Sequence, residues 1–301
     1  MRSFYLTAVL VICGWTLSGG MSMAADKIKV LIVDGQNNHD FERTTPYLKT
    51  VLEKTGKFAV FVATTPAGDN AAQWNGFRPQ FSDYQVVVSN YNGKTWPEHA
   101  RVAFEDFVKN GGGVVNVHAA NNPHADWPEF NKMIGLGWRG ADFGPRLTVD
   151  DAGKPVTAEK GQGPGAGHGS QHAYKVVTRD LENPVMKGFP VEWMHPADEL
   201  YHGQRGPAEG MHILATAYSD KGTGGTGEHE LSTWWIQYGK GKVLTTLLGH
   251  VSRGQDPQTW PMRCQGFQAI LTRGCEWVAT DQVTIPLPKE MPAADKPALA
   301  E

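Results

Sequence analysis

The chain has 301 residues, three cysteines and a net charge of −3 at neutral pH. A charge this close to zero does not favour nucleic acid or a membrane surface as a partner. The length allows a substantial hydrophobic core. We therefore expect one domain with insertions, over residues 25–286.

The first residues have the pattern of a signal peptide. Arg2 precedes an apolar run from Phe4 to Trp15, and Ser22 and Ala24 suit the minus three and minus one positions of a cleavage site. We expect residues 1–24 to be removed and the mature protein to be exported, periplasmic or extracellular, without stable membrane association. An uncleaved anchor is the alternative, although the run is short for a bilayer span.

Apolar segments from Ile28 to Val117 alternate between strand-like and helix-like periods. A cap and first-turn proline at Thr44-Thr45-Pro46 predict the start of one helix, and Pro97 predicts the start of a second. The expected strands are Ile28–Val33, Phe58–Ala63, Gln85–Ser89 and Gly113–Val117. This β-α-β alternation predicts a parallel, doubly wound sheet with helices on both faces.

After Arg139 the sequence pattern changes to that of a β-rich region. Further strands are expected at Arg146–Val149, Ala173–Thr178, Ile213–Tyr218, Leu231–Tyr238 and Val243–Leu248. The glycine-rich stretch Gly161–Gln171 lacks the Lys-Ser/Thr ending of a phosphate loop, so it is either a mobile loop that closes over a site or an inert linker. Residues 287–301 have the composition of a disordered tail.

Outside the leader the chain has two cysteines, Cys264 and Cys275, both in one expected helix. Eleven helical residues separate them by about 16 Å, which is too far for a disulfide. Phe267, Leu271 and Val278 share their helical face. Both thiols are therefore expected to be reduced and to line the core.

Three histidines follow expected strands directly. His39 comes after the first strand, His118 after the central one and His250 after a late one. Ligands of open parallel sheets bind beyond the carboxyl ends of the strands. One such histidine is more often structural, but three at one edge favour a functional cluster.

The segment PADELYHGQRG combines carboxylate, phenol and imidazole groups. Asp198 and Glu199 stand beside Tyr201 and His202, a set that suits proton transfer. The alternative is that Asp198 caps a turn and Tyr201 packs in the core. Trp138, Trp234 and Trp235 lie near these motifs and either stack on sugar rings or belong to the core.

The sequence resembles the ThuA-like, or trehalose-utilisation, proteins. The resemblance covers Lys27 to Thr280 and rests on NNHD, GGGVVNVHAA, GHGSQH, NPVMKGFPVEW with DELY, WWIQYGKGKV and LLGH. It implies a flavodoxin-like fold related to class I glutamine amidotransferases, with β-rich insertions. Those enzymes carry a cysteine nucleophile where this chain has His118, so the sequence excludes glutaminase chemistry unless Cys264 or Cys275 is misplaced in this interpretation.

The resemblance also implies sugar breakdown through 3-keto intermediates. Isomerisation or elimination of a 3-keto sugar needs a base, for which Glu199 is the candidate, and a group that stabilises an enediolate. His118 and His250 are candidates for that role, either directly or through a divalent metal such as zinc that His39 helps to hold. The candidate substrate contacts are Asn38, Asn121, Arg139, Asp198, Tyr201, His202 and Trp235.

Two other functions remain open at this stage. One is a secreted module that binds carbohydrate without turnover, and the other is a metal-dependent hydrolase of a glycosidic or ester bond. All three take a small carbohydrate as ligand and are compatible with a homo-oligomer. The sequence does not decide among these three functions.

Overall fold

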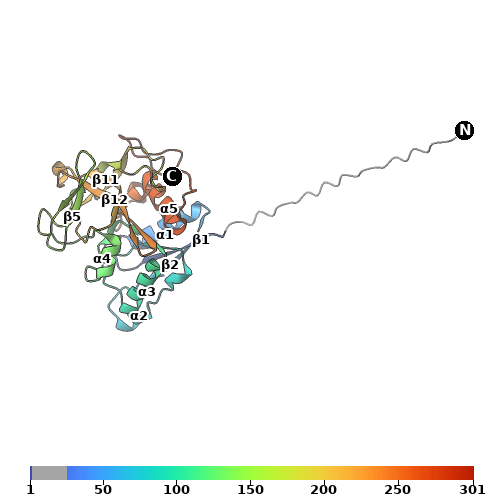
Figure 1. Cartoon of the computed structure of the whole chain (residues 1–301). Coiled ribbons are helices and arrows are strands. Elements are labelled where there is room, and N and C mark those ends of the chain that lie inside the picture. Colours follow the sequence, from blue (N-terminus) through green and yellow to red (C-terminus); the bar gives the residue numbers. More distant parts are fainter. Residues whose placement is uncertain (2–25) are drawn as a thin grey trace.

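An 11-stranded sheet runs through the molecule in the computed structural model, which describes residue 1 and residues 26–301 (Figure 1). The strand order along its main path is β2-β1-β3-β4-β13-β12-β11-β8-β9, and β5 and β6 are attached to β12. The predicted signal peptide lies, apart from Met1, outside the described residues. None of the described helices has the length and apolar character needed to cross a membrane.

The first half of the sheet is parallel, as the sequence predicts. Its strands are β1 (Ile28–Asp34), β2 (Phe58–Thr64), β3 (Val86–Ser89), β4 (Gly113–Val117) and β13 (Gly241–Thr246). Each is paired in parallel with its neighbours in this half. The carboxyl ends of β1, β4 and β13 therefore meet at one edge.

Helices cover both faces of this parallel half, which confirms the predicted doubly wound architecture. They are α1 (Phe41–Lys54) and α5 (Gln265–Thr280) on one face, and α2 (Ala71–Gly76), α3 (Glu98–Lys109) and α4 (Pro128–Ile134) on the other. Because successive side chains of a strand point to opposite faces, Ile32 packs with Leu48 of α1 in one core cluster. Its neighbour Val33 packs with Phe104 of α3 in a second.

The second half of the sheet is antiparallel. It contains β5 (Arg146–Val149), β6 (Pro155–Ala158), β8 (His172–Thr178), β9 (Glu192–Asp198), β11 (Met211–Tyr218) and β12 (His229–Tyr238). The short strands β7 (Gly167–His168) and β10 (Tyr201–His202) form a separate ladder in which His168 pairs with Tyr201. The sequence prediction misses β6, β7, β9 and β10.

The predicted start of the first helix is wrong. Helix α1 begins at Phe41, and Thr44 N donates a hydrogen bond to the Asp40 carbonyl (2.9 Å). The Thr44 and Thr45 hydroxyls do not cap the helix, because both accept hydrogen bonds from Asn90 Nδ2 (3.0 Å each). The capping chemistry expected at this point instead ties α1 to the end of β3.

The predicted disorder of residues 287–301 is also wrong. Met194 N of β9 donates to the Ala293 carbonyl (2.7 Å), and Gln265 N at the start of α5 donates to the Ala298 carbonyl (2.8 Å). The composition has few residues that form a core, but backbone hydrogen bonds to two distant elements hold the segment in place.

Both cysteines are free and buried, as predicted. Cys264 is the residue that immediately precedes α5, and Cys275 lies within the helix. Burial raises the pKa of the Cys275 thiol, which keeps it protonated.

Removal of residues 293–301 tests whether the tail stabilises the domain. The deletion eliminates the backbone hydrogen bonds to β9 and α5, each worth about 1 kcal/mol. We expect urea unfolding to show a free energy lower by about 1–3 kcal/mol with a similar slope. An unchanged midpoint would contradict a packed tail.

Candidate active site

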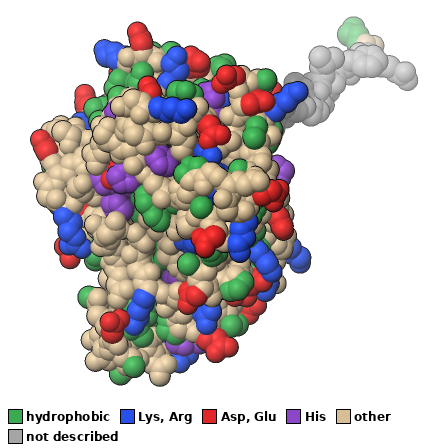
Figure 2. Space-filling view, turned by 90° about the vertical axis from the view of Figure 1, so that its left-hand side faces the viewer, with side chains coloured by type: hydrophobic (Ala, Val, Ile, Leu, Met, Phe, Trp, Pro, Cys, Tyr) green, Lys and Arg blue, Asp and Glu red, His purple; other side chains and the backbone are tan. Residues whose placement is uncertain are grey.

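Three imidazoles meet at the carboxyl edge of the parallel strands. The ring centroids of His39 and His118 are 4.9 Å apart, those of His39 and His250 are 4.9 Å apart, and those of His118 and His250 are 5.3 Å apart. All three residues are buried. Figure 2 shows histidine side chains gathered on one face of the molecule.

The backbone at His118 makes a sharp turn. Its φ of 49° lies in the left-handed region, directly after β4 and at the start of a short 3-10 helix over His118–Asn121. A residue with a side chain adopts this conformation only when its surroundings enforce it, and such strain gathers at functional sites. The turn brings the His118 ring into the cluster.

Hydrogen bonds fix the tautomers of two of these rings. His118 Nδ1 lies 2.7 Å from the Leu247 carbonyl, which can only accept, so Nδ1 carries the hydrogen. His39 Nδ1 donates to Asn37 Oδ1 (3.1 Å), and the Asn37 amide is oriented by its own donation to the Asn90 carbonyl. In both neutral rings the lone pair is therefore on Nε2, and His118 Nε2 is buried without a hydrogen-bond partner.

The pKa values of these rings favour the neutral form. Burial, with a contribution from the nearby His250, lowers the pKa of His39 to about 4. Burial and the neighbouring histidines lower the pKa of His118 well below its usual value. At neutral pH both rings are electron-pair donors and not cations.

Glu199 completes the cluster. Its Oε1 lies 3.2 Å from His250 Nε2 and its Oε2 lies 3.7 Å from His118 Nε2. One donor atom from each of Glu199, His39, His118 and His250 falls within 4.8 Å of the others. Tetrahedral zinc sets its ligands about 3.4 Å apart, so side-chain shifts of about an ångström would bring the three imidazoles around an ion, with Glu199 beside them.

The environment of the rings also suits a metal. Histidines that bind metals usually donate their other ring N–H to a carbonyl or carboxylate. His39 and His118 do so to Asn37 and Leu247. The residues present therefore fit a divalent ion such as zinc.

Asp198 is a structural anchor, which corrects its expected role as a substrate contact. Its side chain is fully buried and accepts hydrogen bonds from Gly249 N (2.7 Å) and His250 N (3.0 Å). It also pairs with His195 Nε2 (2.7 Å). Burial lowers the pKa of His195, but Asp198 and the Cys264 thiol outweigh it and raise that pKa to about 9.

Asn121 and Arg139 likewise bind the protein itself, in place of the expected sugar hydroxyls. Asn121 Nδ2 donates to Gln204 Oε1 (2.9 Å), and the side chain is fully buried. The Arg139 guanidinium donates to the Pro123 carbonyl (2.7 Å) and to Asn131 Oδ1. Neither residue lines the cavity beside the histidines.

His202 and Trp235 also lie away from that cavity. His202 Nδ1 is 3.4 Å from Ser219 Oγ. The Trp235 ring stacks on His212 with centroids 4.2 Å apart and contacts Trp277 of α5 edge-on. Trp235 and the fully buried Trp234 belong to the packing of the domain.

The cavity beside the cluster has a volume of about 550 Å³. Of the predicted residues, it brings together Asn38, His39, Glu199, Tyr201 and His250, while His118 lies behind His39. Its other lining residues are Asn92, Asn122, Trp138, His168, Ser252 and Arg253. Neither cysteine lines it.

His168 is a site residue that the sequence analysis does not single out. Its Nε2 lies 3.6 Å from Glu199 Oε1, on the glycine-rich stretch Gly161–Gln171. The buried Arg205 holds this stretch by donating to the Pro164 carbonyl (2.7 Å). The stretch is therefore no inert linker. The motif GHGSQH is its only sequence signal, because a glycine-rich loop has no hydrophobic period.

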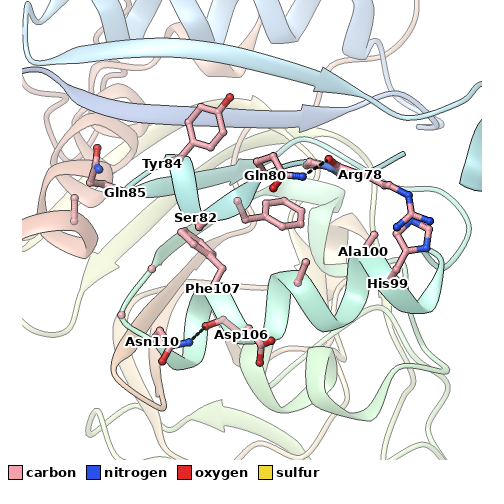
Figure 3. Close-up of a pocket in the computed structure, with 16 residues that line it drawn as sticks. Arg78, Gln80, Ser82, Tyr84, Gln85, His99, Ala100, Asp106, Phe107 and Asn110 are labelled. Atoms are coloured by element: carbon pink, nitrogen blue, oxygen red, sulfur yellow. Dashed lines mark hydrogen bonds between the residues drawn. The ribbon is translucent and has the colours of Figure 1, made fainter. Parts of the chain in front are cut away.

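A larger cavity of about 600 Å³ lies at the opposite edge of the sheet (Figure 3). Its lining includes Gln85 and Gly112, which precede β3 and β4. Its histidine, His99, has Nε2 within 3.0 Å of the Phe77 carbonyl. No group of potential metal ligands falls here among the described residues, so the histidine cluster remains the candidate site.

Comparison with known proteins shows the family to which the chain belongs. The family model for ThuA, described as trehalose utilisation, matches residues 29–278. The chain belongs to the ThuA family. The family has a glutamine amidotransferase-like fold and a carbohydrate-related function.

Two solved ThuA-like structures are similar to the chain. One, from Parabacteroides merdae ATCC 43184, is 41% identical, with a TM-score of 0.85 over 91% of this chain and 98% of that one. Another, from Bacteroides uniformis ATCC 8492, is 18% identical, with a TM-score of 0.57 over 88% and 98%, and shows the fold alone. No curated protein matches the chain.

The buried His195–Asp198 pair predicts a pH-dependent stability. Because the folded pKa of His195, about 9, exceeds the ordinary 6.5, the charged ring stabilises the fold below pH 6.5. That contribution is lost as the pH rises through 9. We expect the difference in unfolding free energy between wild type and His195→Gln to shrink by about 3 kcal/mol from pH 6 to pH 9.5. A difference that does not change with pH would contradict the charged pair.

Proposed function

We propose that this protein acts on 3-keto sugars or 3-keto glycosides by removing the proton next to the carbonyl, with isomerisation or elimination as the outcome. The observation that carries the proposal is the position of Glu199, whose carboxylate faces a polar cavity beside three clustered imidazoles. Membership of a trehalose-utilisation family supports a carbohydrate substrate.

Glu199 is placed to act as the base. Its side chain is 12% exposed, so it reaches the cavity while most of it is shielded from water. Its backbone N–H donates to Asp198 Oδ1 (2.7 Å), which fixes the start of the turn that carries it. A positioned carboxylate of this kind contributes by general base catalysis.

Glu199 is the base in both of the proposed reactions. Glu199 takes the proton from C2 of a 3-keto sugar, and the bonding pair moves into the carbonyl to form an enediolate. In isomerisation the C2 hydroxyl loses its proton and becomes the new carbonyl, while C3 receives the proton that Glu199 removed from C2 and the C3 oxygen receives the hydroxyl proton. In elimination the pair forms a C1–C2 double bond as the C1–O bond breaks, and the departing oxygen takes a proton. His168, which contacts Glu199 and is partly exposed, is placed to supply that proton.

The hydrogen bonds of His39 Nδ1 and His118 Nδ1 support a metal-assisted stabilisation of the enediolate. His118 Nε2 carries no hydrogen when Nδ1 donates to Leu247, so this neutral ring cannot donate to an oxyanion directly. We therefore favour a metal held by His39, His118 and His250, three of the four clustered residues, with Glu199 left as the base. His250 Nε2 lies 3.2 Å from Glu199 Oε1 and becomes a ligand once its hydrogen has moved to Nδ1. When bound, the ion would act as a Lewis acid that polarises the substrate carbonyl.

Other cavity residues are suited to hold the sugar. Trp138 packs edge-on against Tyr201 with centroids 4.6 Å apart, and both line the cavity as apolar surfaces. Burial raises the pKa of the Tyr201 phenol, so it stays a hydrogen-bond donor. The amides of Asn38, Asn92 and Asn122 provide further donors and acceptors for hydroxyls.

The proposal includes export, on the basis of the leader pattern in residues 1–24. N-terminal sequencing of the protein recovered from the periplasm or medium tests it. A mature chain that begins at or next to residue 25 would support export, and an intact leader on cytoplasmic protein would contradict it.

The base is tested by exchange of the C2 proton in deuterated water. With a panel of 3-keto glycosides, Glu199→Gln should keep ligand binding and lose about 10²- to 10⁴-fold in exchange rate. Glu209→Gln, at an exposed position, is the matched control and should exchange like wild type. No exchange above background by wild type, despite sugar binding, would identify a carbohydrate-binding module instead.

The metal is tested by calorimetric titration of chelator-treated protein with zinc. Wild type should bind one equivalent, and His118→Ala and His39→Ala should each weaken binding at least about tenfold, since each removes one of three imidazoles. His99→Ala, in the remote cavity, should bind like wild type. Unchanged zinc binding in both cluster variants would contradict the assigned ligands.

A further inference from the structure

A second cavity adjoins the candidate site. It has a volume of about 460 Å³ and shares Ser252 and Arg253 with the cavity that contains Glu199. Its remaining lining includes Gln171, Gln255 and Thr259 and contains no aromatic residue. Each cavity is of a size that holds a small ligand, so the two together provide room for a substrate with two units.

Arg253 gives the shared rim a positive charge. It is the only lysine or arginine that lines either cavity, and the second cavity has no aspartate or glutamate in its lining. Among the described residues, no carboxylate forms an ion pair with it within 4.0 Å. Its one hydrogen bond goes from Nη2 to the Asn37 carbonyl (3.3 Å), which leaves most of its five N–H donors free for a ligand.

The rim that carries Arg253 is held in place by contacts to the start of α1. Arg43 Nη2 donates to the Gln255 carbonyl (2.7 Å), and Gly254 N donates to Asp40 Oδ2 (3.3 Å). Arg43 and Asp40 are themselves paired at 2.7 Å. The positive group is therefore presented by a loop with fixed ends, which lowers the ordering cost of binding.

We propose that the second cavity is a subsite for a carboxylate-bearing unit of the substrate, which Arg253 recognises. The proposal rests on the proposed function, because it takes the sugar that reacts to lie over Glu199 and the acidic unit to extend across Ser252. A guanidinium matches a carboxylate with two parallel hydrogen bonds. Gln171, which lines the second cavity and contacts His250 Nδ1 at 3.2 Å, marks where the two units join.

Calorimetry with two sugars that differ in one group tests the subsite. Cellobiitol and cellobionate share an open-chain second unit, which ends in a neutral hydroxymethyl group in the first and in a carboxylate in the second. Wild type should bind cellobionate about tenfold or more tightly than cellobiitol, since hydrogen bonds to a charged group are the stronger ones. Arg253→Gln should remove this preference, and Arg253→Lys should keep only part of it.

Arg78→Gln is the control, because it removes the same charge at the remote cavity. The preference for cellobionate should survive in this variant. Equal binding of the two sugars by wild type, or equal losses in Arg253→Gln and Arg78→Gln, would overturn the subsite. A preference for cellobionate that survives the Arg253→Gln substitution in chelator-treated protein would also overturn the subsite. Exchange of the C2 proton is measured separately, so a preference without exchange would keep the subsite and reject the proposed reaction.

Discussion

The site depends on the hydrogen bonds that the buried carboxylate of Asp198 accepts. Asp198 lies at the end of β9 and accepts hydrogen bonds from the backbone of Gly249 and His250, which follow β13. Strands β9 and β13 are far apart in the sheet order, with β12, β11 and β8 between them. This one side chain therefore fixes Glu199, the next residue, beside His250. Its pairing with the charged His195 offsets the cost of burying the carboxylate.

The parallel half of the sheet provides the rest of the site with neutral donors. Because Nδ1 of His39 and of His118 is committed to a protein acceptor, their lone pairs converge on the space that Glu199 faces. The separate ladder of β7 and β10 closes the cavity with Tyr201 and with His168 on its anchored loop. The ends of the parallel strands thus supply the three imidazoles, and the later β-rich segments supply Glu199 and the wall of the cavity.

The sequence predicts the parallel strands and the shared edge well, because buried parallel strands are continuous apolar runs and their topology places His39, His118 and His250 together. It misses β9, in which Pro196 and His195 interrupt any simple alternation. It also assigns Asn121 and Arg139 to the ligand. Only the folded structure shows that these two side chains instead donate hydrogen bonds to the Gln204 side chain and to the Pro123 carbonyl. The tail is ordered by backbone bonds to β9 and α5, which composition cannot reveal.

We infer that His39, His118 and His250 form one metal-binding site with Glu199 at its open side. X-ray absorption spectroscopy of the zinc-loaded protein tests it most directly, because the method identifies the ligand atoms without a substrate or an assay. We expect three imidazole nitrogens at about 2.0–2.1 Å from the zinc and no sulfur. A zinc–sulfur distance of about 2.3 Å, or fewer than three imidazoles, would contradict it.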